Sequence, residues 1–351
     1  MARRAHLIGA WPGRDPEHAM ELALEHLALH LDRMTDGETG DRHLWITPGL
    51  DGFRANPDVE IVRDGGWTSY EDTARWRVKD GVSLDPDNIR LRYALSFEGS
   101  FPAFKVLRER YGRPDLRFQV GIPAPIDLAV DAFAEDAFAD PSIIAACTAA
   151  TAREIDRIAP QGGDDVVFQI ETVVALVGVA QAPDEAQTAA SEQMAAGLCD
   201  LVRRAPDGTR FGFHLCLGDF HHKAFGKMRD ARPLVLLANA IAATFPPGQV
   251  LEYVHAPFAA AVEPPISDEA FYDPLRDLRL PDDVRFIAGF LHESLDLAAH
   301  QELLARIESL TDREVDVAAA CGLGRRPTHE QAFEAMREAA ALIAAAPAAS
   351  G

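Results

Sequence analysis

The chain alternates short apolar runs with amphipathic stretches, and this alternation limits its fold more than any other feature. Eight runs are short enough to be strands buried on both faces, and each is followed by turn or helix-forming sequence. They span residues 5–11, 31–38, 117–123, 166–172, 210–216, 249–255, 284–290 and 315–321. Buried strands separated by helical segments are typical of parallel sheets. We therefore expect an α/β protein, specifically a (β/α)8 TIM barrel.

The segments between the strands have the spacing of helices that cover such a barrel. Helix-like patterns occupy residues 16–34, 141–159, 184–205, 233–245, 296–310 and 328–345. A doubly wound open sheet is the competing arrangement, but the chain contains no glycine-rich dinucleotide fingerprint after a strand. The barrel is therefore the preferred interpretation.

One polar segment, residues 48–110, interrupts this rhythm with aromatic, glycine and proline residues. It is too long for a plain loop in a compact domain, so we expect an inserted excursion over the C-terminal face of the barrel. Such an excursion is either a solvated insertion or part of the active site. The predicted organisation is one catalytic barrel over residues 1–346 with a disordered tail at 347–351.

Charge and cysteine usage exclude several classes of protein. The formal net charge is −21, which argues against a nucleic-acid partner and against binding to an anionic membrane surface. Four widely separated cysteines do not form a small disulfide framework. The sequence contains neither a signal-peptide core nor a membrane-spanning stretch. We expect a cytoplasmic protein whose oligomeric state is open.

The predicted strand 210–216 carries two candidate ligands on one face. Because side chains alternate across a strand, its large apolar residues share the face that meets the helices. His214 and Cys216 share the other face and point into the barrel, with Cys216 near the C-terminal end of the strand. Barrel chemistry occurs at that end. Taken alone, this pair favours core packing over a ligand role, since a free cysteine is often a small buried apolar residue.

Two further strands strengthen the ligand interpretation. Glu252 lies on an otherwise apolar strand, where a buried carboxylate needs a partner. Cys321 lies where the last strand ends. Together with His214 and Cys216 they form a set typical of tetrahedral zinc, and mixed nitrogen and sulfur ligands favour zinc over iron or copper. Such a zinc ion could activate a thiol as a nucleophile.

Two other polar residues have alternative roles. Asp219 either orients a ligand imidazole or a substrate, or caps a helix. Arg42 either holds a substrate carboxylate, or pairs with Glu38 or Asp41.

These motifs resemble a known family. The segments "HLC", "LEYV" and "ACGLGRR" are similar to the zinc-ligand segments of the C-terminal catalytic barrel of cobalamin-independent methionine synthase. Its superfamily includes core methionine synthases, zinc-dependent alkyl-thiol transferases and uroporphyrinogen decarboxylase. The resemblance implies His214, Cys216, Glu252 and Cys321 as zinc ligands. The spacing from Cys216 to Glu252 is longer than in the family, so His255 is an alternative fourth ligand.

Further segments extend the resemblance. "DGETGDR" places Glu38 where the family binds the substrate amino group, and "FQIET" places Glu171 near the substrate. "GGWTSY" resembles a stretch that places Trp67 and Tyr70 over the site. Glu171 and His292, both at strand ends, are candidates for the general acid.

The sequence also departs from the family pattern. Ala10 replaces the first-strand serine that contacts homocysteine, and Ala320 replaces the aspartate before the last cysteine. His292 is displaced relative to the family histidine. These departures leave the methyl donor and the acceptor thiol open.

The resemblance implies a Zn²⁺-dependent methyltransferase that acts on a thiol, as in methionine biosynthesis. The acceptor is homocysteine or another small thiol, and the donor is folate, methylcobalamin or another methyl compound. One alternative is a non-catalytic zinc-binding sensor or interaction protein. A second is a metal-free barrel enzyme related to uroporphyrinogen decarboxylase, which would leave the two cysteines and Glu252 without a role.

Overall fold

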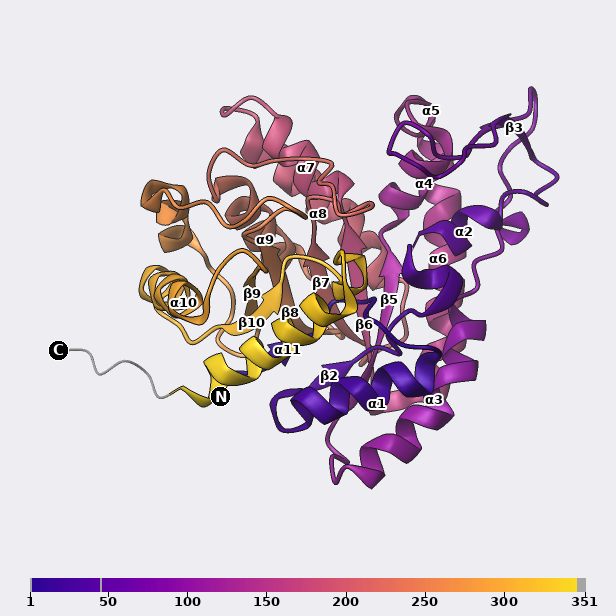
Figure 1. The fold of residues 1–351 in the computed structure, drawn as a ribbon. Coiled ribbons are helices and arrows are strands. Elements are labelled where there is room, and N and C mark those ends of the chain that lie inside the picture. The colour runs from indigo at the N-terminus through magenta and orange to yellow at the C-terminus, as the bar shows by residue number, and fades with distance from the viewer. Residues whose placement is uncertain (1, 45, 346–351) are drawn as a thin grey trace.

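Eight parallel strands form the centre of the protein in the computed structural model, which describes residues 2–44 and 46–345 (Figure 1). Their order is β1-β10-β9-β8-β7-β6-β5-β2, and an isolated parallel bridge between Ala5 and Leu31 brings the two edges together. The fold is therefore a near-closed α/β TIM barrel, as predicted. The strands are β1 (Ala5–His6), β2 (Arg33–Met34), β5 (Arg117–Pro123), β6 (Val166–Thr172), β7 (Arg210–Leu215), β8 (Val250–Pro257), β9 (Arg285–Leu291) and β10 (Asp316–Ala319).

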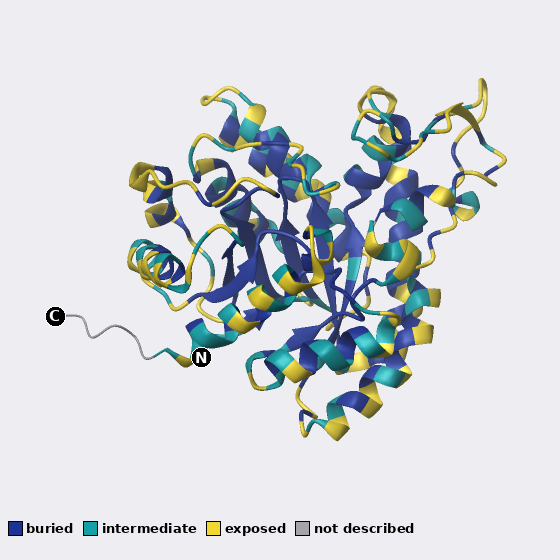
Figure 2. Cartoon of the chain, in the orientation of Figure 1, coloured by how far each residue is buried: buried dark blue, intermediate teal, exposed yellow. Residues whose placement is uncertain are grey.

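Helices surround the strands, with buried inner faces and exposed outer faces (Figure 2). The longer ones are α1 (Pro16–Leu27), α3 (Tyr93–Arg110), α4 (Pro125–Phe133), α6 (Pro141–Gly162), α7 (Val174–Gln181), α8 (Gln187–Arg203), α9 (Arg232–Thr244), α10 (Leu297–Thr311) and α11 (His329–Ala344). The short ones are α2 (Thr47–Asp51) and α5 (Asp136–Ala139). Short 3-10 helices span Ala28–His30, Gly40–His43, Pro86–Asn88, Gly163–Asp165, Glu269–Asp277 and Leu323–Arg325.

Local sequence determines where several of these helices begin. The Asp15 carboxylate accepts a hydrogen bond from the His18 N–H, and Pro16 occupies the first helical position of α1. At α11, Thr328 and Gln331 form a reciprocal capping box. These caps satisfy N–H groups that a helix leaves unpaired at its start.

The segment 48–110 contains two different structures. Its first part forms a hairpin of β3 (Val59–Arg63) and β4 (Arg75–Val78), which lies beside α4 and α5 at the upper right of Figure 1. Phe53 packs against Trp76 and against Phe133 of α4, with ring centroids 5.7 and 5.2 Å apart. Its last part is α3, an 18-residue helix whose phenylalanines pack in the main core.

The interior of the barrel holds a buried polar network. The Gln169 amide donates to Glu171 Oε1 at 2.7 Å, and its oxygen accepts from the Tyr253 hydroxyl at 3.0 Å. Gly212 makes room for this tyrosine, because an added Cβ there would lie 2.1 Å from its ring. The network therefore holds the Glu171 carboxylate through the Gln169 amide.

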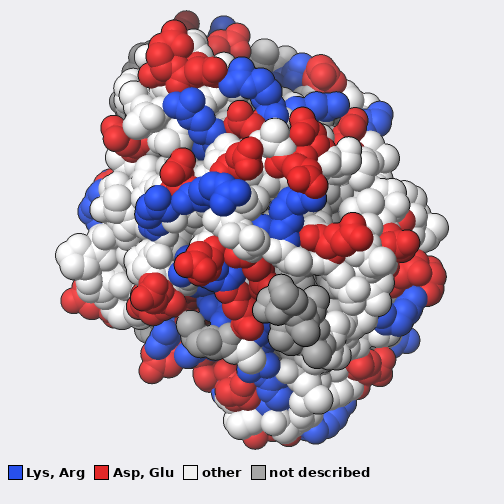
Figure 3. Space-filling view, turned by 90° about the vertical axis from the view of Figure 1, so that its left-hand side faces the viewer, with Lys and Arg blue, Asp and Glu red and all other residues white. Residues whose placement is uncertain are grey.

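Charged side chains are mixed over the surface. On the face shown in Figure 3, Lys and Arg alternate with Asp and Glu. Across residues 2–44 and 46–345, no helix combines the length and apolar character needed to cross a bilayer. The predicted tail at 347–351 lies outside the described residues.

Candidate functional site

Three of the predicted ligands meet at the C-terminal end of the barrel. His214 lies near the end of β7, Cys216 directly follows that strand, and Cys321 lies just beyond β10. One ligand atom from each residue can be chosen so that all lie within 4.8 Å of one another. All three side chains are buried. The structure thus assembles a compact nitrogen and sulfur cluster from two strands far apart in sequence.

The spacing of the two sulfur atoms fits a tetrahedral metal. The Sγ atoms of Cys216 and Cys321 lie 3.8 Å apart. Two thiolates bound to zinc at about 2.3 Å with tetrahedral angles would be about 3.8 Å apart, whereas a disulfide requires about 2.05 Å. The Cys216 thiol donates to Cys321, and this hydrogen bond lowers the pKa of Cys321. The donor set therefore suits zinc.

Glu252 does not belong to this cluster, which corrects the prediction that it is the fourth ligand. It lies near the start of β8, at the opposite end of the barrel. Its carboxylate pairs with Arg33, Arg117 and Arg210 at 3.4, 3.5 and 3.2 Å. These are the first residues of β2, β5 and β7. The buried carboxylate has a partner, as expected, but the partner is this group of arginines.

His255 takes the place beside His214. A bulge in the β7–β8 pairing shifts the inward face of β8 to Tyr253 and His255. The Nδ1 atoms of His214 and His255 lie 2.8 Å apart, and His255 Nε2 lies 3.1 Å from the Ala319 carbonyl oxygen. Burial lowers the pKa of both imidazoles, which for His255 falls to about 3. Both rings are therefore neutral near pH 7.

These contacts assign the tautomers. A carbonyl oxygen only accepts, so His255 carries its proton on Nε2 and donates to Ala319. Its Nδ1 then accepts from the Nδ1–H of His214. This leaves the Nε2 lone pair of His214 free to bind a metal, which is how outer hydrogen bonds orient histidine ligands.

Two carboxylates converge next to the cluster. Glu38 and Glu171 both approach Gly121, where an added Cβ would lie 2.8 and 2.7 Å from their Oε1 atoms. Burial raises the pKa of Glu38 to about 7, and burial together with the charge of Glu38 raises that of Glu171. Glu38 adopts a φ of 43°, which is uncommon for a residue with a side chain. The loop is thus constrained so that Glu38 faces Glu171.

Two arginines flank these carboxylates. Arg42 donates to Asp36 at 2.6 Å, and its positive charge also acts on Glu38. Arg325 was not predicted. It follows Cys321 closely and lines the same cavity as Glu38 and Glu171. The basic pair "RR" at residues 325 and 326, shortly after the last cysteine, was the only signal for it in the sequence.

The polar excursion reaches the loop that follows β7. The Tyr70 hydroxyl accepts from the Phe220 N–H at 3.1 Å and donates to the Lys223 carbonyl at 3.0 Å. The Trp67 carbonyl lies 2.9 Å from His221 Nε2. Trp67 and His221 have φ values of 57° and 51°. Strained backbone of this kind is concentrated at functional sites.

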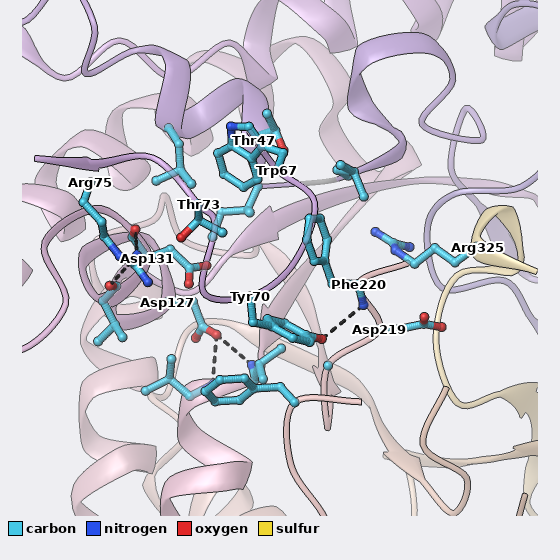
Figure 4. Close-up of a pocket in the computed structure, with 18 residues that line it drawn as sticks. Thr47, Trp67, Tyr70, Thr73, Arg75, Asp127, Asp131, Asp219, Phe220 and Arg325 are labelled. Atoms are coloured by element: carbon cyan, nitrogen blue, oxygen red, sulfur yellow. Dashed lines mark hydrogen bonds between the residues drawn. The ribbon is translucent and has the colours of Figure 1, made fainter. Parts of the chain in front are cut away.

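An outer cavity of about 140 Å³ lies beneath the excursion (Figure 4). Its walls include Trp67, Tyr70 and Phe220. It shares Val173, Asp219 and Arg325 with an inner cavity of about 20 Å³. The inner cavity is lined by the three cluster residues and by Glu38 and Glu171. The two cavities are therefore adjacent, with the candidate ligands around one and residues of the excursion around the other.

His292 lies apart from both cavities. Its Nε2 is 3.1 Å from the Ala261 carbonyl oxygen and therefore donates to it. Its Nδ1 accepts from the Ser294 hydroxyl at 2.8 Å. It lines neither the inner nor the outer cavity. Both ring nitrogens are therefore engaged in hydrogen bonds, one to the loop after β8 and one to the loop after β9.

Comparison with known proteins gives structural neighbours only. No family model matches the chain, and no curated protein matches it. A B12-independent methionine synthase from Shewanella sp. W3-18-1, solved in complex with selenomethionine, has a TM-score of 0.61 at 13% identity, covering 98% of this chain and 97% of that one. A putative vitamin-B12-independent methionine synthase from Listeria monocytogenes has a TM-score of 0.59 at 11% identity, covering 98% of both chains.

A methyltransferase from Methanosarcina mazei has a TM-score of 0.53 at 14% identity, covering 97% of this chain and 94% of that one. At these identities, the likeness shows a shared fold over nearly the whole chain.

Proposed function

We propose that this protein is an enzyme that transfers a methyl or alkyl group to a small thiol, with zinc held by His214, Cys216 and Cys321. The observation that carries the proposal is the buried cluster of these three side chains at the catalytic end of the barrel. The names of the structural neighbours, two B12-independent methionine synthases and a methyltransferase, support the same chemistry.

Three protein ligands suit a catalytic rather than a closed structural zinc site, because one tetrahedral position remains for substrate. When bound there, zinc would hold the acceptor sulfur as a thiolate near neutral pH. His255 orients the imidazole of His214, and the strand ends of β7 and β10 fix the two cysteine sulfurs.

The surrounding charges favour an acceptor that is an amino thiol. Glu38 and Glu171 converge beside the cluster and would bind an ammonium group. Arg325 lines the same cavity and would pair with a carboxylate. A further cavity of about 30 Å³ lies beyond Glu38, next to Arg42, and provides space for the rest of the molecule. Homocysteine has this combination of groups, as do other amino thiols.

The two alternatives explain less of the structure. A metal-free enzyme would not require two buried sulfur atoms placed 3.8 Å apart beside a histidine. A non-catalytic zinc protein would not require two converging carboxylates and connected cavities. Because such neighbouring thiols persist in a reducing compartment, a cytoplasmic location is part of the proposal.

A direct test uses methyl iodide, a methyl donor that needs no binding site. Zinc-loaded protein is incubated with homocysteine, cysteamine and an alkyl thiol that lacks an amino group, and thioethers are measured by mass spectrometry. We expect the wild type to accelerate methylation of the amino thiols and the Cys216→Ser variant to give the uncatalysed rate. If no thiol is methylated faster and the zinc X-ray absorption spectrum gains no sulfur ligand, the non-catalytic alternative replaces this proposal.

A further inference from the structure

The outer cavity is walled on one side by aromatic rings. The ring of Phe220 lies 6.3 Å from that of Trp67 and 5.4 Å from that of Tyr70, measured between centroids. Tyr70 also packs against Phe225 at 5.1 Å. The faces and edges of such rings form an apolar wall whose π electrons attract cations.

Asp219 lies at the boundary between this aromatic wall and the inner cavity. The residue is 7% exposed, and its side chain is fully buried. Neither carboxylate oxygen has a hydrogen-bond partner among the described residues, and the nearest histidine nitrogen, His222 Nδ1, is 3.9 Å away. A buried carboxylate without partners is costly, so the site is incomplete without a ligand.

The basic groups near Asp219 are engaged elsewhere. Arg326 pairs with Glu293 at 3.0 Å, and His222 Nε2 lies 2.8 Å from the same carboxylate. Arg325 is shared between Asp219, Glu38 and Glu171. The Asp219 carboxylate therefore stays unpaired, which favours a positively charged ligand and opposes a polyanionic one.

The size of the cavity restricts the ligand further. Its volume of about 140 Å³ is close to that of cavities, of about 150 Å³, that accommodate benzene. Folates and corrinoids are several times larger than benzene. The enclosed part of this cavity therefore accommodates a compact group.

We propose that the outer cavity binds a small onium cation, a sulfonium or quaternary ammonium compound, and that this cation is the methyl donor. The inference rests on the proposed function for its chemical role. The cation lies against Trp67, Tyr70 and Phe220 and is paired with Asp219, which faces the inner cavity where the acceptor sulfur binds.

The reaction balances without an acid or a redox partner. The acceptor thiol first loses its proton to solvent. Its sulfur electron pair then forms a bond to the methyl carbon, while the bond from that carbon to the positive nitrogen or sulfur breaks. The bonding pair stays on the leaving atom, so the products are a methyl thioether and a neutral amine or thioether. No protonation of the leaving group is required, which agrees with the hydrogen-bonded state of both His292 ring nitrogens.

Binding is tested by calorimetry on zinc-loaded and metal-free protein. The probes are choline, trimethylsulfonium and the uncharged isostere of choline in which carbon replaces nitrogen. We expect choline to bind about tenfold or more tightly than its isostere. The comparison of choline with trimethylsulfonium distinguishes the two onium classes. Equal affinity for choline and its isostere, or no detectable onium binding, would overturn the proposal.

Two matched variants locate the site. Asp219 and Asp131 lie on opposite sides of Tyr70 in the same cavity (Figure 4). We expect Asp219→Asn to weaken onium binding about tenfold and Asp131→Asn to change it by no more than about threefold. Phe220→Leu, which removes an aromatic face at similar volume, should weaken cation binding but not isostere binding. If both aspartate variants weaken binding equally, a general negative field explains it and the assignment to Asp219 is wrong.

Turnover separates this inference from the proposed function. Thioether formation is compared for methyl iodide, trimethylsulfonium and tetramethylammonium with the same amino thiol. Acceleration with methyl iodide and an onium donor supports both proposals. Acceleration with methyl iodide alone overturns the donor assignment and leaves thiol alkylation standing. Onium binding without thioether formation from any donor overturns the proposed function, and the donor role with it.

Discussion

The Nδ1 atoms of His214 and His255 face each other at 2.8 Å across the neighbouring strands β7 and β8. Because His255 Nε2 donates to the Ala319 carbonyl, the proton between the two rings belongs to His214. This hydrogen bond leaves the Nε2 lone pair of His214 free to bind the proposed metal. Together with the hydrogen bond from His255 to Ala319, it links β7 through β8 to β10, the strand that precedes Cys321.

Replacing His255 should weaken metal binding without removing a ligand. In His255→Phe the volume remains, but His214 is no longer held in one tautomer, so zinc affinity should fall about 10–100-fold. Competition with a chromophoric chelator measures the change. Glu252→Gln is the control and should keep wild-type affinity. The orienting role is excluded if His255→Phe binds zinc as tightly as the wild type.

Replacing the cysteines should remove the metal itself. Serine is nearly isosteric with cysteine, but its hydroxyl is a far poorer zinc ligand than a thiolate. We expect Cys216→Ser and Cys321→Ser to lose most bound zinc, and Cys199→Ser, a buried cysteine outside the cluster, to retain it. Elemental analysis of freshly purified protein gives the zinc content per chain. Full occupancy in the double variant would show that the metal lies elsewhere.

Strand alternation predicted the barrel and the inward direction of two residues of the His214, Cys216 and Cys321 cluster, because both depend on local pattern. Each of the eight predicted runs overlaps one strand of the barrel. Phe211 and Phe213 pack toward the helices as expected, and His214 and Cys216 therefore point inward. Cys321 was located by the end of its strand and by the resemblance of "ACGLGRR" to a family segment.

Glu252 was misplaced because β8 continues to Pro257, which leaves Glu252 near the start of the strand, and because strand alternation fails at a bulge. The irregular pairing of β7 with β8 changes which residues of β8 face inward, and a single sequence gives no sign of it. Arg325 and the unpartnered carboxylate of Asp219 depend on loops that meet only in the folded chain. Helix α3 was not predicted, because Pro102 and polar residues obscure its apolar face.

Glu252 should contribute to stability and not to catalysis. Glu252→Gln leaves Arg33, Arg117 and Arg210 without their shared counter-charge at the N-terminal end of the barrel. Removing one partner of such a buried ion-pair network should cost on the order of 2–3 kcal/mol of unfolding free energy. Urea unfolding monitored by circular dichroism measures this loss. A drop in zinc content at unchanged stability would contradict the structural role.

The ionisation of Glu38 should control binding of the amino thiol. Burial raises its pKa from 4.5 to about 7, so the carboxylate becomes fully charged only above neutral pH. Binding of homocysteine to zinc-loaded protein should therefore increase as pH rises through about 7, beyond the change seen with a thiol that lacks an amino group. In Glu38→Gln this additional increase should disappear. Calorimetric titrations of both thiols across pH 6–8 provide the comparison.

The raised pKa of Glu38 should also make the unfolding free energy depend on pH. Between about pH 4.5 and 7, the folded protein binds more protons at Glu38 than the unfolded chain does. The contribution of Glu38 to the unfolding free energy is therefore fully present below about pH 4.5 and is lost as pH rises through about 7. Across this window, the unfolding free energy of the metal-free wild type should fall by up to about 3 kcal/mol relative to that of Glu38→Gln. Urea unfolding of both proteins at each pH measures the difference, and parallel curves would show that Glu38 is not protonated in the folded state.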